Sequence, residues 1–235
     1  MSAFILKIIA LVSMTCDHIS YVIYRKVSYL NYIGRFAFPI FAFQISEGYT
    51  HTRSLMKYSL RLLVFALLSQ IPFSLYLSRL TNGYTLNVFF TLFLGLMALL
   101  IFDKFSKIEC KSKFLHYSNI VIGIICVICL AVIAQVTNCD YGAYGISIIF
   151  IFYLLKDHKV LMNLAFIATT FVYYFDRLTS SSNFNIYLIS FICTCLSIVI
   201  IDLYNGKKGL NIKYLLYIFY PVHLLLFYYL TFVLW

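Results

Sequence analysis

Four ionisable residues lie inside stretches of the chain that are otherwise apolar. Asp17 and His18 follow the apolar run 8–14, Arg35 opens a second apolar segment, and His223 lies within the last one. A carboxylate near a histidine can fix the tautomer of the imidazole or hold a cation, which leaves the imidazole to act as a general base. Arginine offers a rigid fork of donors to an anion or a carbonyl oxygen. These four residues are therefore candidates for proton transfer and for binding a polar substrate.

The composition of the chain explains why such residues are unusual here. Of the 235 residues, 63% are hydrophobic and 11% are charged, whereas an ordinary soluble domain has about 25% charged residues. This composition excludes a water-soluble globule and predicts a protein that crosses a membrane several times. A charged side chain at the centre of a bilayer costs about 3 kcal/mol even on the lenient insertion scale, so each ionisable residue in a span is a functional hypothesis.

We place nine membrane-spanning helices in the apolar segments of the chain. A spanning helix needs roughly 20 mostly apolar residues, and the segments are 4–24, 33–51, 59–79, 86–102, 118–137, 141–155, 160–176, 185–203 and 213–234. The longest hydrophilic stretch is too short to hold a core of its own, which predicts one all-α membrane bundle over residues 1–235. Only a short polar turn separates 141–155 from 160–176, and merging these two segments would give eight spans.

The positions of the cations predict the orientation of the bundle. Short loops rich in Lys and Arg stay in the cytoplasm, and 13 of the 18 Lys and Arg residues fall on one side if the N-terminus is inside. Topology thus accounts for the net charge of +10, and no nucleic-acid partner is needed. The seven cysteines show no metal-ligand spacing and no disulfide framework, which is typical of small buried hydrophobes.

Each charged candidate also has a purely structural interpretation. Asp17 and His18 are consistent with a buried salt bridge that only locks helices together. Arg35 is consistent with an arginine that snorkels to the interface, and the competing interpretations are a pair with Asp17 or a clamp on an anion or a carbonyl. A lone histidine on an apolar helix is more often a packing residue. Two histidines, His18 and His223, with an acid and an arginine at similar depth favour a site instead.

Three further polar positions lie near the ends of predicted spans. Glu47 is followed by several cations, including Arg61, which predicts an ion pair at the inner interface. Asn87, Thr91 and Gly95 follow one another at helical spacing, which is typical of a helix-packing seam. Asn87 lies near the outer end of its span, where it could also hydrogen-bond a substrate.

Two loops carry possible binding residues. The outer segment 140–145 contains Tyr141 and Tyr144, and it could cap a pocket with aromatic walls. The inner turn contains Asn205, Lys207 and Lys208 between glycines, an arrangement that suits phosphate oxygens. The simpler explanation of the inner turn is an ordinary cationic loop on the cytoplasmic side.

These motifs together resemble the TraX family of bacterial membrane proteins. The resemblance covers nearly the whole chain. Its most specific motifs are Asp17-His18-Ile19 and Gly34-Arg35-Phe36-Ala37-Phe38-Pro39. The other matching motifs are Asn87-Val88-Phe89-Phe90-Thr91, the segments 140–145 and 204–209, and Phe219-Tyr220-Pro221-Val222-His223. The family takes its name from a conjugation protein that acetylates the N-terminal amine of pilin. The resemblance implies a multi-span acetyltransferase of the bacterial cytoplasmic membrane.

The resemblance also implies roles for the candidate residues. The donor would be cytosolic acetyl-coenzyme A, and the acceptor would be an amine or a hydroxyl of a protein N-terminus, a sugar or a small molecule. His18 would be the general base, with Asp17 as its orienter or as the partner of Arg35. The other expected roles are an acyl pocket lined by Arg35 and Asn87, a second polar wall from His223, and phosphate contacts from Lys207 and Lys208.

Two other classes of function are compatible with the same residues. A transporter or proton-coupled permease could use Asp17, His18, Arg35 and His223 as a polar pathway. A structural partner in an envelope complex would need none of them for binding a small molecule. Binding of acetyl-coenzyme A separates the enzyme from both alternatives.

Overall fold

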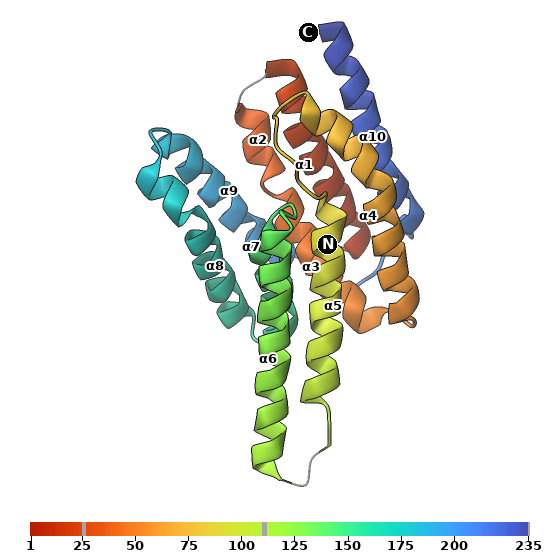
Figure 1. Ribbon diagram of the computed structural model, residues 1–235, viewed down its shortest axis with the longest axis vertical. Helices are drawn as coiled ribbons and strands as arrows, with labels where there is room; N and C mark the ends of the chain where they lie inside the picture. Colours follow the sequence, from red (N-terminus) through yellow and green to blue (C-terminus); the bar gives the residue numbers. More distant parts are fainter. Residues whose placement is uncertain (25–26, 110–111, 235) are drawn as a thin grey trace.

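The computed structural model describes residues 1–24, 27–109 and 112–234, and its regular structure is helical throughout (Figure 1). One isolated bridge joins Leu86 to Cys139. Lys111, one of the 13 cations assigned to the inner side, lies outside the described residues. The ten helices are α1 (Ala3–Tyr24), α2 (Tyr29–Gly34), α3 (Ala37–His51), α4 (Leu55–Ser78), α5 (Val88–Ser106), α6 (Lys113–Val136), α7 (Gly142–Leu154), α8 (Lys159–Ser180), α9 (Phe184–Asp202) and α10 (Lys213–Leu234). The predicted all-α class is confirmed.

Six of the helices, α1, α4, α5, α6, α9 and α10, are long and apolar enough to cross a membrane. Their outward faces carry large apolar side chains, as on α6, where Phe114, Val121, Ile128 and Val136 are exposed. Faces of this extent need an apolar solvent, so the chain is a membrane protein. The other three predicted spans fall on the α2–α3 pair, on the short apolar helix α7 and on α8.

The predicted span 33–51 is wrong in one respect, because the chain forms two helices there. Helix α2 starts at a capping box on Ser28 and ends at Gly34, and α3 begins at Ala37. Pro39 has no amide hydrogen and cannot donate to the carbonyl of Arg35, four residues earlier, so the helical ladder is interrupted between α2 and α3. The predicted segments 141–155 and 160–176 are separate helices, α7 and α8.

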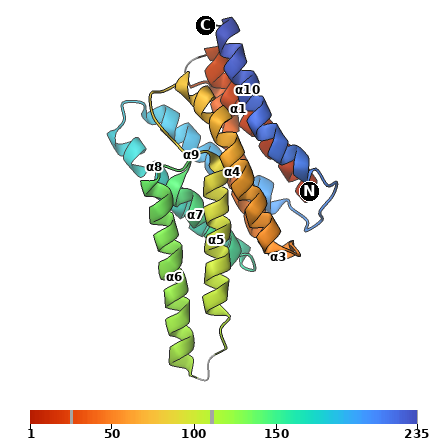
Figure 2. The same cartoon turned by 45° about the vertical axis from the view of Figure 1, so that its right-hand side comes forward.

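The two ends of the bundle differ. The last turn of α10 lies at one end of the long axis, and the end of α5 and the start of α6 lie at the other, beyond the remaining helices (Figures 1 and 2). The N-terminus is held by the α9–α10 connection, because the amide of Ala3 donates to the carbonyl of Lys207 (2.8 Å) and that of Phe4 to Lys208 (3.1 Å). The Lys207–Lys208 turn therefore lies beside the start of α1.

Small residues allow α5 and α7 to approach closely. A Cβ atom added at Gly95 would lie 2.3 Å from Ile149 Cδ1, and one added at Gly145 would lie 2.4 Å from Thr91 Cγ2. The interpretation of Asn87, Thr91 and Gly95 as a packing seam is confirmed for its last two members.

A buried carboxylate joins three helices near the C-terminal end of α5. Asp103 is 7% exposed; it accepts hydrogen bonds from Tyr49 Oη on α3 (2.7 Å), from Tyr153 Oη on α7 and from Lys107 Nζ. No residue pattern separates this aspartate from the hydrophilic stretch that it begins.

Substitution of Asp103 by alanine should destabilise the bundle by about 3 kcal/mol, because it leaves two tyrosine hydroxyls and a lysine without their shared acceptor. The measurement is reversible unfolding of the purified protein in detergent micelles. Asp157→Ala, which removes an exposed carboxylate in the α7–α8 turn, should change stability by less than about 0.5 kcal/mol. Equal stability of the two variants would contradict a structural role for Asp103.

Candidate functional site

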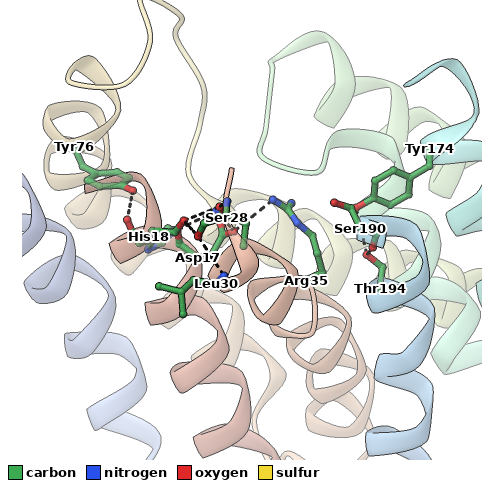
Figure 3. Close-up of polar contacts among 11 residues, drawn as sticks. Asp17, His18, Ser28, Leu30, Arg35, Tyr76, Tyr174, Ser190 and Thr194 are labelled. Atoms are coloured by element: carbon green, nitrogen blue, oxygen red, sulfur yellow. Dashed lines mark hydrogen bonds and ion pairs between the residues drawn. The ribbon is translucent and has the colours of Figure 1, made fainter. Parts of the chain in front are cut away.

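A cavity of about 180 Å³ lies among α1, α3, α8, α10 and the α6–α7 connection. Figure 3 shows polar contacts near it, with Asp17 and His18 on α1 and Arg35 beside them; Tyr174 and Thr194, across from Arg35, are not lining residues. Its polar lining residues are Asp17, His18, Tyr21, Arg35, Asp140, Tyr141, Tyr173 and Tyr220. The cavity therefore brings together four of the predicted site residues: Asp17, His18, Arg35 and Tyr141.

Asp17 is held as the partner of Arg35. Its Oδ1 atom lies 3.4 Å from Arg35 Nη2 and accepts a hydrogen bond from Asn31 Nδ2 (3.0 Å). The Asn31 side chain is fully buried, and its Oδ1 accepts from Ser20 Oγ (2.6 Å) and the Ser28 amide (2.8 Å). The pairing interpretation of Arg35 is confirmed.

The glycine before Arg35 is required by this geometry. A Cβ atom at Gly34 would lie 2.4 Å from Cβ of Asp17 and 2.7 Å from its Oδ1. Any side chain there would displace the carboxylate that pairs with Arg35. Close approach of α2 to α1 thus explains the Gly-Arg step of the motif.

His18 is hydrogen-bonded to His223 and not to Asp17. The distance from His18 Nδ1 to His223 Nε2 is 2.8 Å, and the two ring planes differ by 9°. His223 is 4% exposed, and its Nδ1 lies 2.8 Å from the carbonyl oxygen of Phe219. The expectation that Asp17 orients His18 is therefore wrong, because His223 occupies that position.

The hydrogen bonds of this pair assign both tautomers. A carbonyl oxygen only accepts, so His223 Nδ1 carries the hydrogen and its Nε2 is an acceptor. His18 must then donate from Nδ1, which leaves Nε2 of His18 with a free lone pair. His18 lines the cavity, so the site contains one imidazole with an unprotonated nitrogen.

The α6–α7 connection reaches the cavity in a strained conformation. Asn138 and Tyr141 have positive φ angles of 53° and 66°, which are uncommon for residues other than glycine. Two backbone hydrogen bonds join this segment to Leu86. The Leu86 amide donates to the Asn138 carbonyl (3.0 Å), and the Leu86 carbonyl accepts from the Asp140 amide (2.8 Å). The ring of Tyr141 stacks on Phe38 with centroids 3.7 Å apart. The connection is thus fixed where it lines the cavity.

Asp140, in this connection, faces the charges of the Asp17–Arg35 pair. Burial raises the pKa of the Asp140 carboxyl to about 7, the negative charge of Asp17 adds to the effect, and the Arg35 guanidinium opposes it. The cavity therefore contains two carboxyl groups and one guanidinium, and the guanidinium is paired with Asp17.

Asn87 and Tyr144 are not among the lining residues of the cavity, and their polar atoms contact other parts of the protein. Asn87 caps α5 through the amide of Phe89 (3.0 Å), and its Nδ2 donates to the Ala66 carbonyl (2.7 Å) and to Gln70 Oε1 (2.8 Å). Tyr144 Oη lies 3.1 Å from Thr170 Oγ1. Every polar atom of the Asn87 side chain is thus engaged within the protein.

The remaining predicted residues lie toward the other end of the bundle. Asn205, Lys207 and Lys208 form an exposed turn, in which Asn205 Oδ1 accepts from the Lys207 amide (3.1 Å). Glu47 is predicted to form an ion pair with the cations that follow it, and this partner is wrong. The Glu47 carboxylate lies 3.7 Å from His51 Nδ1 instead.

Glu47 also lies near Tyr204. Burial and Glu47 together raise the pKa of Tyr204 to about 12.

Arg61, the cation named as a partner of Glu47, instead contacts aromatic rings. Its guanidinium carbon lies 5.7 Å from the ring centroid of Tyr58, and its side chain hydrogen-bonds Tyr217 on α10. These contacts join α4 to α10.

The sequence did not single out three residues that support the site: Asn31, Tyr76 and Tyr173. Tyr76 donates to the carbonyl oxygen of His18 (2.8 Å), and Tyr173 lines the cavity. The position of Asn31, three residues after Ser28, was a usable capping signal. No comparable signal exists for the tyrosines, because the chain contains 21 of them.

Comparison with known proteins places this chain in a family. No solved structure matches it. The probable fimbrial assembly protein FimC, serogroup H1, of Dichelobacter nodosus is 28% identical over 242 residues, which cover 96% of this chain and 93% of that protein. The uncharacterized protein RP591 of Rickettsia prowazekii (strain Madrid E) is 26% identical over 222 residues, covering 90% and 83%. The model of the TraX protein family matches residues 2–231, and the chain therefore belongs to the TraX family.

Proposed function

We propose that the protein is an integral-membrane acetyltransferase in which His18 is the general base. The observation that carries the proposal is the hydrogen-bonded pair of His18 and His223, which leaves a basic nitrogen at the cavity wall. A general base must reach the proton that it removes, and a fixed tautomer provides the lone pair before the substrate arrives. The family resemblance supplies the reaction class.

The chemistry assigned to the site is direct transfer of an acetyl group. Nε2 of His18 takes a proton from the acceptor while the nitrogen or oxygen of the acceptor bonds to the thioester carbonyl carbon. The carbon–sulfur bond then breaks, and His18 returns the proton to the leaving sulfur. Arg35 lines the same cavity, so its guanidinium can donate to the developing oxyanion.

The donor that we propose is acetyl-coenzyme A. The cavity of about 180 Å³ is smaller than a typical ligand pocket of roughly 300–1,000 Å³, and it suits the acetyl thioester alone. Lys207 and Lys208, beside the start of α1, supply cations for the phosphates. The 14 helical steps from Phe4 to His18 correspond to about 21 Å, a span that an extended pantetheine arm matches.

The acceptor that we propose is an amine or a hydroxyl of an envelope component. The fimbrial assembly protein among the relatives favours a fimbrial subunit, and the N-terminal amine of such a subunit is the group that the resemblance implies. The cavity holds two carboxyl groups and one guanidinium. This balance favours a positively charged acceptor over an anionic one.

The proposed orientation has nine spans in the bacterial cytoplasmic membrane, with the N-terminus inside. The α7–α8 and α9–α10 turns contain exposed lysines, which supports this orientation because short loops rich in Lys and Arg stay in the cytoplasm. The cavity, which contains residues of the α6–α7 connection, then lies in the outer half of the membrane. The donor would reach it from the cytosol.

Substitution of His18 by alanine should lower acetyl transfer at least about 100-fold, because general bases contribute roughly that much or more. The measurement is transfer of radiolabelled acetyl from acetyl-coenzyme A to n-butylamine by the protein in lipid nanodiscs. His158→Ala removes an exposed histidine in the α7–α8 turn and should leave the rate within twofold. Undiminished transfer by the His18 variant would refute the base assignment, and no transfer by the wild-type protein would refute the acetyltransferase proposal.

Single cysteines introduced into a variant without native cysteines should report the orientation. Ser182→Cys, in the exposed α8–α9 turn, should react with a membrane-impermeant maleimide in intact cells from which the outer membrane has been stripped. Lys156→Cys, in the exposed α7–α8 turn, should react only after lysis, because that turn faces the cytoplasm. The opposite pattern would reverse the orientation.

A further inference from the structure

We propose that Asp140 is a second acid–base residue of this site, which binds the acceptor as an ammonium ion and removes its first proton. The inference rests on the proposed acetyl transfer and adds to it a residue and a protonation state of the acceptor. Asp140 lines the same cavity as His18 and Arg35. The α6–α7 connection supplies it, so it comes from a different element than either of them.

The backbone around Asp140 is fixed on every side. Its amide donates to the carbonyl of Leu86 (2.8 Å), and its carbonyl accepts from Thr91 Oγ1. Tyr141 and Gly142 follow it with positive φ angles of 66° and 44°. A positive φ angle at a residue other than glycine, as at Tyr141, is retained where surrounding contacts over-determine it. These contacts hold the Asp140 side chain at the cavity.

The two carboxylates of the cavity differ in their partners. Asp17 is engaged by Arg35 Nη2 at 3.4 Å and by Asn31 Nδ2 at 3.0 Å. Within the described residues, the hydrogen-bond partner of the Asp140 carboxyl is the backbone amide of Tyr141. The charge of Arg35 is thus matched by Asp17, and the negative charge of ionised Asp140 is left to attract a cation.

The groups that face Asp140 come from several elements. They are Asp17 of α1, Arg35 between α2 and α3, Tyr220 of α10, and the neighbours Cys139 and Tyr141. Asp17 and burial disfavour ionisation of Asp140, and Arg35 favours it. With a pKa of about 7, Asp140 is protonated in acid and becomes a proton acceptor as the pH rises through neutrality.

Acetylation of an ammonium ion requires two proton acceptors. The ion must lose one proton to become a nucleophile, and the nitrogen must lose a second proton after it bonds to the acetyl carbon. Asp140 takes the first proton and releases it to solvent, and His18 takes the second and passes it to the departing sulfur. The products are the amide, the free thiol and one proton, so the reaction balances.

Two small amines of different basicity test the role of Asp140. At neutral pH n-butylamine is almost entirely an ammonium ion, like a lysine side chain, whereas methoxyamine is almost entirely neutral. Asp140→Asn should lower acetyl transfer to n-butylamine about 100-fold and transfer to methoxyamine less than threefold. Asp176→Asn removes an exposed carboxylate near the end of α8 and should leave both rates unchanged.

The pH profile provides a second readout that a purely structural role would not produce. Wild-type transfer to n-butylamine should rise through a pH of about 7, as Asp140 ionises, and then level off. In the Asp140→Asn variant this inflection should be absent, and the rate should rise about tenfold per pH unit with the fraction of free amine.

The outcomes separate this inference from the acetyltransferase proposal. Equal losses with both amines, or no loss with either, would overturn the role of Asp140 while leaving acetyl transfer intact. If the asparagine variant does not fold, a wild-type profile without an inflection near pH 7 would overturn it. No transfer by the wild-type protein to either amine would refute the acetyltransferase proposal itself.

Discussion

The hydrogen bond between His18 and His223 connects the first and the last long helix of the chain, and the chemistry of the site depends on it. Inside a membrane every buried polar group must find its partner within the protein. The carbonyl of Phe219 fixes the hydrogen on His223, and His223 fixes the hydrogen on His18. One lone pair remains at the cavity. These two hydrogen bonds, and not a carboxylate, thus fix the imidazole that we propose as the catalytic base.

The carboxylates serve other purposes in this arrangement. Asp17 neutralises Arg35 and holds it against the cavity, with Asn31 as a further support and Gly34 allowing the close approach. Asp140 lies opposite, on a connection whose strained backbone is held by Leu86 and Thr91. The cavity thus contains one paired carboxylate, Asp17, and one unpaired carboxyl group, Asp140. If both carboxyl groups were paired with cations, the cavity would have no negative charge left to attract a cation.

Much of this architecture could be predicted from residue types alone. Apolar segments of spanning length located the helices, because a bilayer allows few alternatives to the helix. The cost of charge in a span then pointed to Asp17, His18, Arg35 and His223, and the structure brings these residues together. The packing seam at Gly95 could be predicted because helices that approach closely need small residues at the contact.

Pairing within the site could not be predicted in the same way. Adjacent residues on a helix point about 100° apart, so Asp17 and His18 necessarily have different partners, and the sequence does not say which. Asn87 was expected at a substrate, but its amide is consumed by the cap of α5 and by Gln70. The break between α2 and α3 depends on Pro39. One proline interrupts the backbone hydrogen bonds locally but hardly changes the mean hydropathy of a segment of this length, so hydropathy does not predict the break.

The protonation states of the two histidines test the central claim most directly. Nitrogen-15 NMR of histidine-labelled protein in lipid nanodiscs distinguishes protonated from unprotonated ring nitrogens, and His18→Gln and His223→Gln variants assign the signals. Near neutral pH, both residues should carry the hydrogen on Nδ1, with Nε2 of His18 unprotonated. A hydrogen on Nε2 of His18 would contradict the account, because the cavity would then contain no basic imidazole nitrogen.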